Sequence, residues 1–160
     1  MKLTRATAQH LKEMMLWFPD EYRYKQWGGP QLRYPFTPQS FFEDCQFDKL
    51  DSYVLLNEQQ HLIGFGQYYL RLERCHFGRL VISPDHRQQG HATTLITALA
   101  KVGIGSLKSN MCSLFVLPEN AAAVKLYTSL GFTRTPYPDN DILIENIWYM
   151  TIASYYLQPK

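Results

Sequence analysis

The chain has 160 residues, of which 46% are hydrophobic and 19% are charged, and its formal net charge at pH 7 is +2. This length and composition predict a single globular domain, residues 1–160, with a sizeable core. The small charge gives no support for nucleic-acid or membrane partners, and no apolar run approaches the roughly twenty residues of a membrane span. The first six residues lack the apolar core of a signal peptide, so none is expected. Neither the three cysteines nor the five histidines have metal-ligand spacing. We therefore expect a cytoplasmic protein without a metal site.

The N-terminal half of the chain is predicted to alternate between short strands and helices. Proline at position 19 ends the first helix, because it restricts the conformation of the residue before it. The glycines and prolines at 28–38 favour an irregular segment. In chain order we predict a strand at Lys2–Arg5, a helix at Ala8–Trp17, an irregular segment at 20–38, a helix at Ser40–Phe47, and strands at Ser52–Leu56 and Leu62–Leu70.

The C-terminal half is predicted to alternate strand and helix before a final pair of strands. In chain order we predict a strand at Cys75–Ile82, a helix at Thr93–Ala100, a strand at Ser113–Leu117, a helix from Asn120 to Leu130, and strands at Phe132–Thr135 and Ile144–Thr151. Antiparallel strands followed by a β-α-β-α-β stretch indicate an α/β (α+β) fold. We expect a central mixed, mostly antiparallel sheet with helices on both faces.

The loop after the strand at 75–82 has the composition of an anion site. The strand stops before Pro84, Arg87 and Gly90 lie in the loop, and a helix begins directly after it. Free backbone N–H groups and the positive end of the helix dipole converge at such a helix N-terminus. The loop has neither the lysine of a Walker loop nor the Gly-x-Gly-x-x-Gly of a dinucleotide site. Another phosphate-bearing ligand is therefore expected there.

Two motifs resemble those of a known enzyme family. The loop reads Arg87-Gln88-Gln89-Gly90-His91-Ala92 and resembles the acetyl-CoA pyrophosphate loop of the GCN5-related N-acetyltransferases (GNAT), whose pattern is Gln/Arg-x-x-Gly-x-Gly/Ala. About thirty residues further on, Asn120, Tyr127 and Gly131-Phe132 resemble the second signature of the same family. Two motifs in the right order are far less expected by chance than either one alone. The chain is identified on this resemblance as GNAT-like, most specifically over 80–132.

The resemblance implies that acetyl-CoA binds along the end of the strand and the loop after it. Gly90 would let the backbone approach the phosphates, because no Cβ intervenes. The backbone of Leu80 and Ile82 would pair with the pantetheine arm much as an added strand would. Asn120 would bond to that arm, although a simple helix cap is the alternative. The residues predicted to hold the cofactor are Leu80, Val81, Ile82, Arg87, Gln88, Gln89, Gly90, His91, Ala92, Thr93 and Asn120.

The resemblance also implies direct attack of a primary amine on the thioester, aided by a general base and a general acid. Tyr127 matches the family tyrosine that reaches the CoA sulfur, so it is the predicted acid; a half-buried tyrosine that only packs is the alternative. His76 occupies the position of the family's catalytic glutamate, and Glu73 lies three residues earlier. An imidazole can accept a proton near neutral pH, but a histidine on a strand is often structural, and a water chain is a third route.

The acceptor amine is less well defined than the donor. Tyr24 and Trp27 lie in a segment that mixes aromatic and basic residues and that the family uses as a wall of the acceptor site; packing onto the core is the alternative. Asp139, Asp141 and Glu145 precede or begin the last strand and would attract a cationic amine; simple solvation of the loop is the alternative. A protein N-terminus, a lysine, an aminoglycoside, a polyamine or a small metabolite all remain open, as do monomer and homodimer.

Two other functions compete with the enzyme. A non-catalytic acyl-CoA sensor would keep the loop but not the chemistry, and the absence of the family glutamate leaves room for it. An RNA- or protein-interaction module would use the aromatic and basic surface around Tyr22–Phe36. The modest net charge and the lack of a nucleic-acid-binding motif make this second alternative the weaker one.

Overall fold

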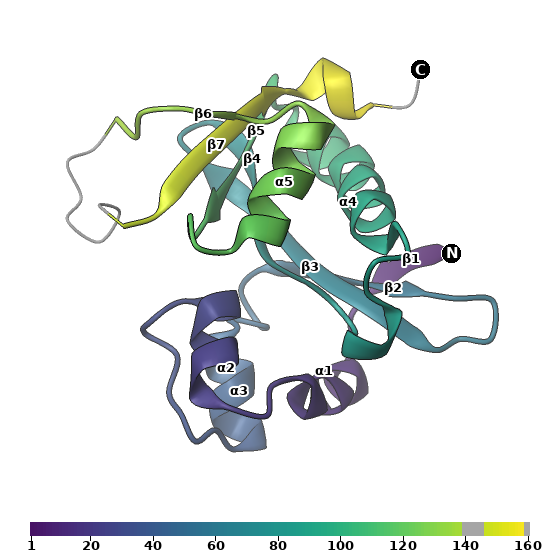
Figure 1. Ribbon diagram of the computed structural model, residues 1–160. Coiled ribbons are helices and arrows are strands. Elements are labelled where there is room, and N and C mark those ends of the chain that lie inside the picture. Colours follow the sequence, from purple (N-terminus) through teal and green to yellow (C-terminus); the bar gives the residue numbers. More distant parts are fainter. Residues whose placement is uncertain (139–145, 159–160) are drawn as a thin grey trace. The chain divides into compact units, whose positions relative to one another are not determined.

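A computed structural model describes residues 1–138 and 146–158 of the chain (Figure 1). It divides into two compact units, the first formed by Met1–Tyr68 and Gly78–Leu99, and the second by Tyr69–Phe77 and Ala100–Lys160. The division passes through β3 (Leu62–Arg71), β4 (Arg74–Ile82) and α4 (His91–Leu107). The described strands form one seven-stranded sheet in the order β1-β2-β3-β4-β5-β7-β6.

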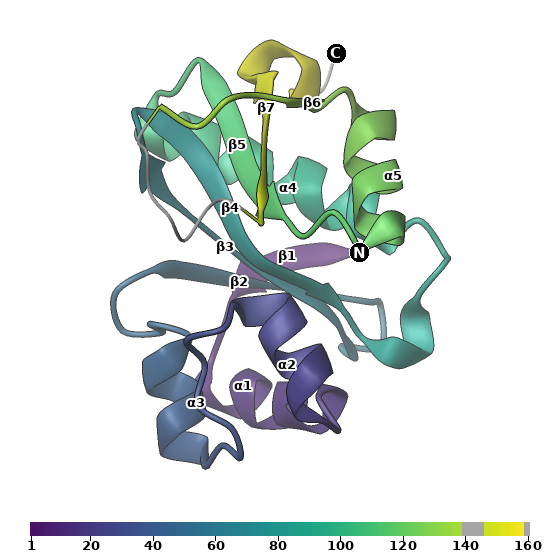
Figure 2. The same cartoon turned by 60° about the vertical axis from the view of Figure 1, so that its left-hand side comes forward.

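The first unit contains β1 (Lys2–Arg5) and β2 (Asp51–Leu56), which pair antiparallel, and β2 pairs antiparallel with β3. Three short helices lie together on one side of these strands in both views (Figures 1 and 2). They are α1 (Ala8–Met14), α2 (Glu21–Gly28) and α3 (Pro38–Asp44), and a 3-10 turn at Met15–Trp17 follows α1.

Two buried clusters in the first unit show that its strands are covered on both faces. The larger cluster joins α1–α3 to the strands and comprises Leu11, Met14, Phe18, Tyr24, Leu32, Phe41, Cys45, Val54, Leu56, Leu62 and Phe65. The smaller cluster joins Leu55 and Ile63 to Leu95 at the start of α4. Val54 and Leu55 are neighbours in β2 and belong to different clusters, as the alternation of side chains along a strand requires. Helices therefore lie on both faces, as predicted.

The helix α2 corrects the prediction that 20–38 is irregular. The Asp20 side chain caps this helix by accepting a hydrogen bond from the Arg23 backbone N–H at 2.8 Å. Lys25 and Glu21, one turn apart, form an ion pair of 2.7 Å along its surface. Gly29, with φ of 109°, follows the last residue of the helix. The glycines mark the end of a helix rather than the absence of one, and that is why the prediction was wrong.

The second unit contains β5 (Met111–Val116), β7 (Trp148–Ala153), the short β6 (Thr133–Arg134) and α5 (Ala121–Leu130). β7 pairs antiparallel with both β5 and β6, and a 3-10 turn at Ser154–Leu157 follows it (Figure 2). β4 and β5 pair in parallel. The sheet is thus mixed and mostly antiparallel, as predicted, while the start predicted for the last strand, Ile144, lies outside the described residues.

Candidate functional site

The predicted phosphate loop connects β4 to α4 within the first unit. β4 ends at Ile82, a 3-10 turn covers Pro84–His86, and α4 begins at His91. Gln88 and Gly90 both have left-handed backbones, with φ of 60° and 79°. A Cβ built on Gly90 would meet nothing within 4 Å, so the space beside this residue is open. The first N–H groups of a helix have no partner within the helix. Where this backbone is exposed, as it is here, those groups can bind an anion.

Three side-chain contacts support this loop. Arg87 Nε donates to the Ile82 carbonyl at 3.3 Å, which ties the loop to the end of the strand. His86 Nδ1 lies 3.2 Å from Ser83 Oγ, and His91 Nε2 lies 3.3 Å from Gln89 Oε1. Arg87 remains exposed, so the rest of its guanidinium is available to solvent or to a ligand.

The glycines of β3 determine how Leu80 and Ile82 pack. A Cβ on Gly66 would lie 2.8 Å from Leu80 Cδ2, and a Cβ on Gly64 would lie 2.8 Å from Ile82 Cδ1. The side chains of both β4 residues therefore occupy space that only glycine leaves free. Their side chains are anchored against β3, which leaves the backbone as the part available to an extended ligand.

The ladder between β4 and β5 is short. It pairs Cys75 with Cys112, His76 with Ser113 and Phe77 with Leu114, and it goes no further along the described strands. β4 continues beyond this ladder to Ile82. The β4 backbone past Phe77 therefore has polar groups that the β5 ladder does not occupy, as the resemblance requires of Leu80 and Ile82.

The helix α5 in the second unit carries the other predicted cofactor and acid residues. The side-chain oxygen of Asn120 caps the helix by accepting a hydrogen bond from the Ala123 N–H at 3.3 Å, so Asn120 is the helix cap that the sequence offered as the alternative role. The NH₂ of its amide takes no part in that bond. Gly131 ends the helix in a left-handed conformation, with φ of 106°. Tyr127 is 9% exposed and meets Phe132 edge-on, with ring centroids 6.0 Å apart. Burial raises the pKa of Tyr127 to about 12, so the phenol keeps the proton that an acid must donate.

His76 is only 1% exposed and lies in a cage of aromatic rings in the second unit. Its Nδ1 is 2.8 Å from Ser113 Oγ, and the centroids of Phe115 and Tyr69 lie 4.7 and 5.1 Å from its ring. Burial, and after it the charge of Arg71, lowers the pKa of His76 to about 3. The imidazole is therefore neutral at physiological pH and holds a proton only weakly, which favours a structural role over a basic one.

Glu73 and the predicted acceptor residues have contrasting environments. Glu73 is an exposed residue with φ of 60° in the turn between β3 and β4.

Tyr24 is 0% exposed, and its ring lies 4.7 Å from that of Phe36 within the large cluster of the first unit. Trp27 is half-buried and stacks on Phe18 at 4.5 Å. This arrangement favours packing for Tyr24, whereas Asp139, Asp141 and Glu145 lie outside the described residues.

Sequence reasoning overlooked one residue next to the predicted cofactor strand. Arg79 has a left-handed backbone, with φ of 50°, inside β4. Nothing in the local sequence announces that conformation, which non-glycine residues rarely adopt. The only available signal was a charged residue within the apolar stretch Phe77–Ile82.

Within the described part of the chain, no group of three or more histidine, cysteine, aspartate or glutamate side chains is placed to hold a metal ion. Nor does any described helix have the length and apolar character needed to cross a membrane.

The family model for the acetyltransferase (GNAT) family matches residues 11–132. The chain therefore belongs to this family, and the predicted family and fold class are confirmed. The predicted enzyme class and its acetyl-CoA donor agree with that membership. A curated relative is the spermidine N(1)-acetyltransferase of Vibrio cholerae serotype O1, which is 27% identical over 111 residues. That alignment covers 68% of this chain and 64% of the relative, a little less than two thirds of its length.

Solved structures agree on the fold. The spermidine N-acetyltransferase from Vibrio cholerae in complex with CoA and spermine has a TM-score of 0.74 at 20% identity, over 98% of this chain and 96% of that chain. The K23-Q34 chimera of the spermidine N-acetyltransferase from Vibrio cholerae and hSSAT has a TM-score of 0.70 at 21% identity, over 99% of this chain and 98% of that chain. At these identities the likeness concerns the fold alone.

Proposed function

We propose that this protein is an acetyl-CoA-dependent N-acetyltransferase that moves the acetyl group to a primary amine by direct attack within a ternary complex. The observation that carries the proposal is the loop from Ile82 to His91. It presents exposed left-handed backbone at Gln88 and Gly90 directly before the N-terminus of α4. Membership of the acetyltransferase (GNAT) family supports acetyl-CoA as the donor.

The residues present fit the cofactor. The N–H groups of Gln89–Thr93 would bind the pyrophosphate, because the first turn of a helix leaves these donors without helical partners. The backbone of Leu80 and Ile82 would receive the pantetheine arm along the part of β4 that the β5 ladder leaves free. The amide NH₂ of Asn120 would donate to the same arm while the amide oxygen caps α5.

The transfer needs three proton movements. The ammonium group first loses a proton, and the neutral amine then attacks the thioester carbon. The carbon–sulfur bond breaks, the departing thiolate takes a proton from the Tyr127 hydroxyl, and the proton that the nitrogen loses as it becomes an amide restores that hydroxyl. Of the three routes for removing the ammonium proton, we propose a chain of water molecules. His76 is buried and neutral, with its Nδ1 bonded to Ser113, and Glu73 lies on an exposed turn. Tyr127, in contrast, is buried and protonated, as the acid must be.

The acceptor class that we propose is a small-molecule primary amine, and the polyamines are its first candidates. This choice rests on the relatives, one of which is a spermidine N(1)-acetyltransferase and another a spermidine N-acetyltransferase in complex with CoA and spermine. We propose that the half-buried Trp27, rather than the fully buried Tyr24, contacts the acceptor.

The deciding experiment measures free-thiol release from acetyl-CoA across a panel of amines. The panel should contain spermidine, spermine, lysine, an aminoglycoside and a peptide with a free N-terminus, with an amine-free control for hydrolysis. We expect amine-dependent release with at least one member, and with a polyamine if the acceptor class is right. Binding of acetyl-CoA without release from any amine would favour the sensor, and absence of binding would reject the donor as well.

A further inference from the structure

Arg79 combines two unfavourable features at a single position in β4. Its φ of 50° is a left-handed conformation that side-chain-bearing residues adopt only at a cost in free energy. Its Nε is buried and, among the described residues, has no hydrogen-bond partner. Strained residues persist only where their surroundings hold them in place, and they cluster at functional sites. Arg79 directly precedes Leu80, the first residue of the predicted cofactor strand.

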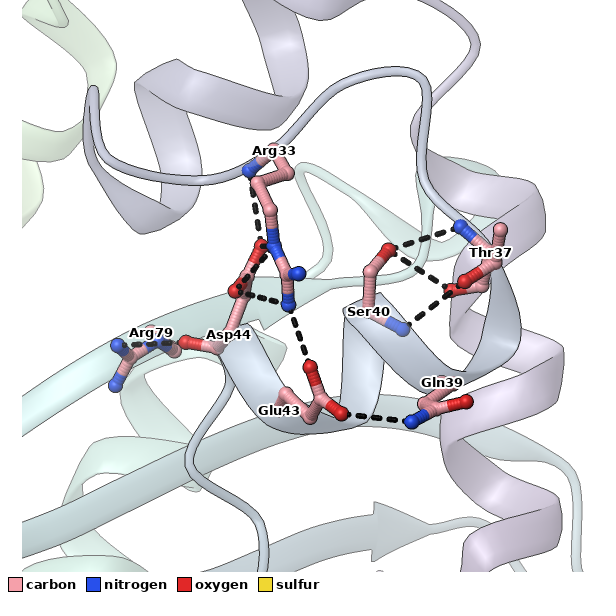
Figure 3. A network of polar contacts seen from close by, with 7 residues as sticks. All are labelled: Arg33, Thr37, Gln39, Ser40, Glu43, Asp44 and Arg79. Carbon is pink, nitrogen blue, oxygen red and sulfur yellow. Dashed lines mark hydrogen bonds and ion pairs between the residues drawn. The ribbon is translucent and has the colours of Figure 1, made fainter.

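The guanidinium of Arg79 is held by two acceptors in the first unit. Nη1 donates to Gln67 Oε1 at 3.0 Å. Nη2 donates to the Asp44 carbonyl at 3.2 Å (Figure 3). Gln67 is itself fully buried, and its Nε2 donates to the Cys45 carbonyl at 2.8 Å and to Ser52 Oγ at 2.9 Å. Because its NH₂ is engaged in this way, the Gln67 oxygen is aimed at Arg79.

The other acceptor is fixed in the same manner. Asp44 is the last residue of α3, and its carboxylate accepts from the Arg33 backbone N–H at 2.9 Å and from Arg33 Nε at 3.1 Å. Arg33 Nη2 also donates to Glu43 at 2.7 Å, so this arginine joins the two acidic residues at the end of α3 (Figure 3). Arg79 is therefore tied to two rigid points, one on β3 and one at the end of α3.

We propose that Arg79 is a positioning residue for acetyl-CoA. Its side chain holds the left-handed bend in β4, and that bend directs the backbone N–H and C=O groups of Leu80 and Ile82 toward the pantetheine arm. A single residue outside the extended conformation changes the direction of the groups that follow it, as at a β-bulge. This inference rests on the proposed function, because it concerns the strand assigned to the cofactor.

Calorimetric titration of acetyl-CoA into the whole protein tests the proposal without knowledge of the acceptor. Arg79→Ala removes both tethers and leaves a Cβ that disfavours positive φ, so we expect the Kd for acetyl-CoA to rise about tenfold. Arg79→Gly also removes the tethers, but glycine adopts positive φ freely, so a smaller rise is expected. Gln60→Gly, at a left-handed residue in the turn after β2 with φ of 66°, and Arg5→Ala, at an exposed ion pair, are the matched controls and should leave the Kd unchanged.

The outcomes separate the possible roles of Arg79. An unchanged Kd in Arg79→Ala, with only a lower melting temperature, would overturn the proposal, because that is what a purely structural residue gives. An equal rise in the alanine and glycine variants would also overturn it, since the guanidinium itself would then contact the ligand. If Arg79→Ala does not fold, Arg79→Lys replaces it; one ammonium cannot reproduce the forked contact, so an intermediate Kd is expected and an unaltered one contradicts the proposal. Failure of the unsubstituted protein to bind acetyl-CoA would instead reject the proposed function.

Discussion

Burial changes the pKa values of Tyr127 and His76 in opposite directions and keeps both side chains neutral. The tyrosine pKa rises to about 12 and the histidine pKa falls to about 3, because a buried site disfavours each charged form. A neutral phenol can donate a proton to a departing thiolate. A neutral imidazole with so low a pKa cannot hold the proton of an ammonium group, and this difference separates the two predicted catalytic residues.

Replacement of Tyr127 by phenylalanine tests the acid. Tyr127→Phe removes only the hydroxyl from a packed ring, so we expect kcat to fall about 100-fold, with the Kd for acetyl-CoA within about twofold of its original value. Steady-state kinetics at saturating acetyl-CoA and calorimetry give the two numbers. Tyr156→Phe, on a ring that is largely exposed, is the control and should change neither. Unchanged turnover in Tyr127→Phe would remove this residue from the acid role.

The buried His76 predicts how stability depends on pH. The unfolded chain takes up a proton on this residue near pH 6.5, whereas the folded chain does so only near pH 3, so stability falls as pH decreases through this window. Between about pH 7 and about pH 4.5 this group alone should cost about 2 kcal/mol of unfolding free energy. In His76→Asn that loss should disappear, which urea unfolding at several pH values would show as a flatter profile. His61→Asn, on the surface, should retain the original slope; the same slope in both variants would contradict the assignment.

Among the elements, β3 controls how closely β4 and α4 can pack. A Cβ on Gly64 would lie 2.8 Å from Ile82 Cδ1 and 3.1 Å from the Val81 carbonyl, and a carbonyl in a strand cannot rotate aside. Gly64→Ala should therefore destabilise the protein by about 1–3 kcal/mol and weaken acetyl-CoA binding, because β4 must move. Gly105→Ala, in α4 where the Cβ meets nothing within 4 Å, should instead stabilise by about 0.5–1 kcal/mol. Thermal unfolding and calorimetry check both, and unchanged binding in Gly64→Ala would contradict the packing argument.

At the scale of the whole molecule, local signals predicted the element order far better than they predicted side-chain environments. The strands and the presence of a helix soon after Thr37 follow from periodicity and capping chemistry, which act between near neighbours in the chain, although α3 begins at Pro38 rather than at the predicted Ser40. The burial of Tyr24 depends on Phe36 and Phe41, which later segments bring against it. The left-handed Arg79 depends on Gln67 and Asp44, 12 and 35 residues away. Sequence patterns carry no measure of such distant contacts. The order of β4, loop and α4 was therefore predictable, and the contacts that hold Arg79 were not.

The stability of the whole protein provides the last prediction. A ligand that binds only the folded state stabilises it by about 2.7 kcal/mol at about 100 times its Kd. For a chain of this length that corresponds to a rise in melting temperature of about 5–10 °C. Acetyl-CoA should give this rise in a thermal-unfolding experiment. Pantetheine lacks the pyrophosphate that the N–H groups before α4 would bind, so it should give a much smaller rise at the same concentration. Equal shifts from the two compounds would show that the loop from Arg87 to Ala92 is not the phosphate site.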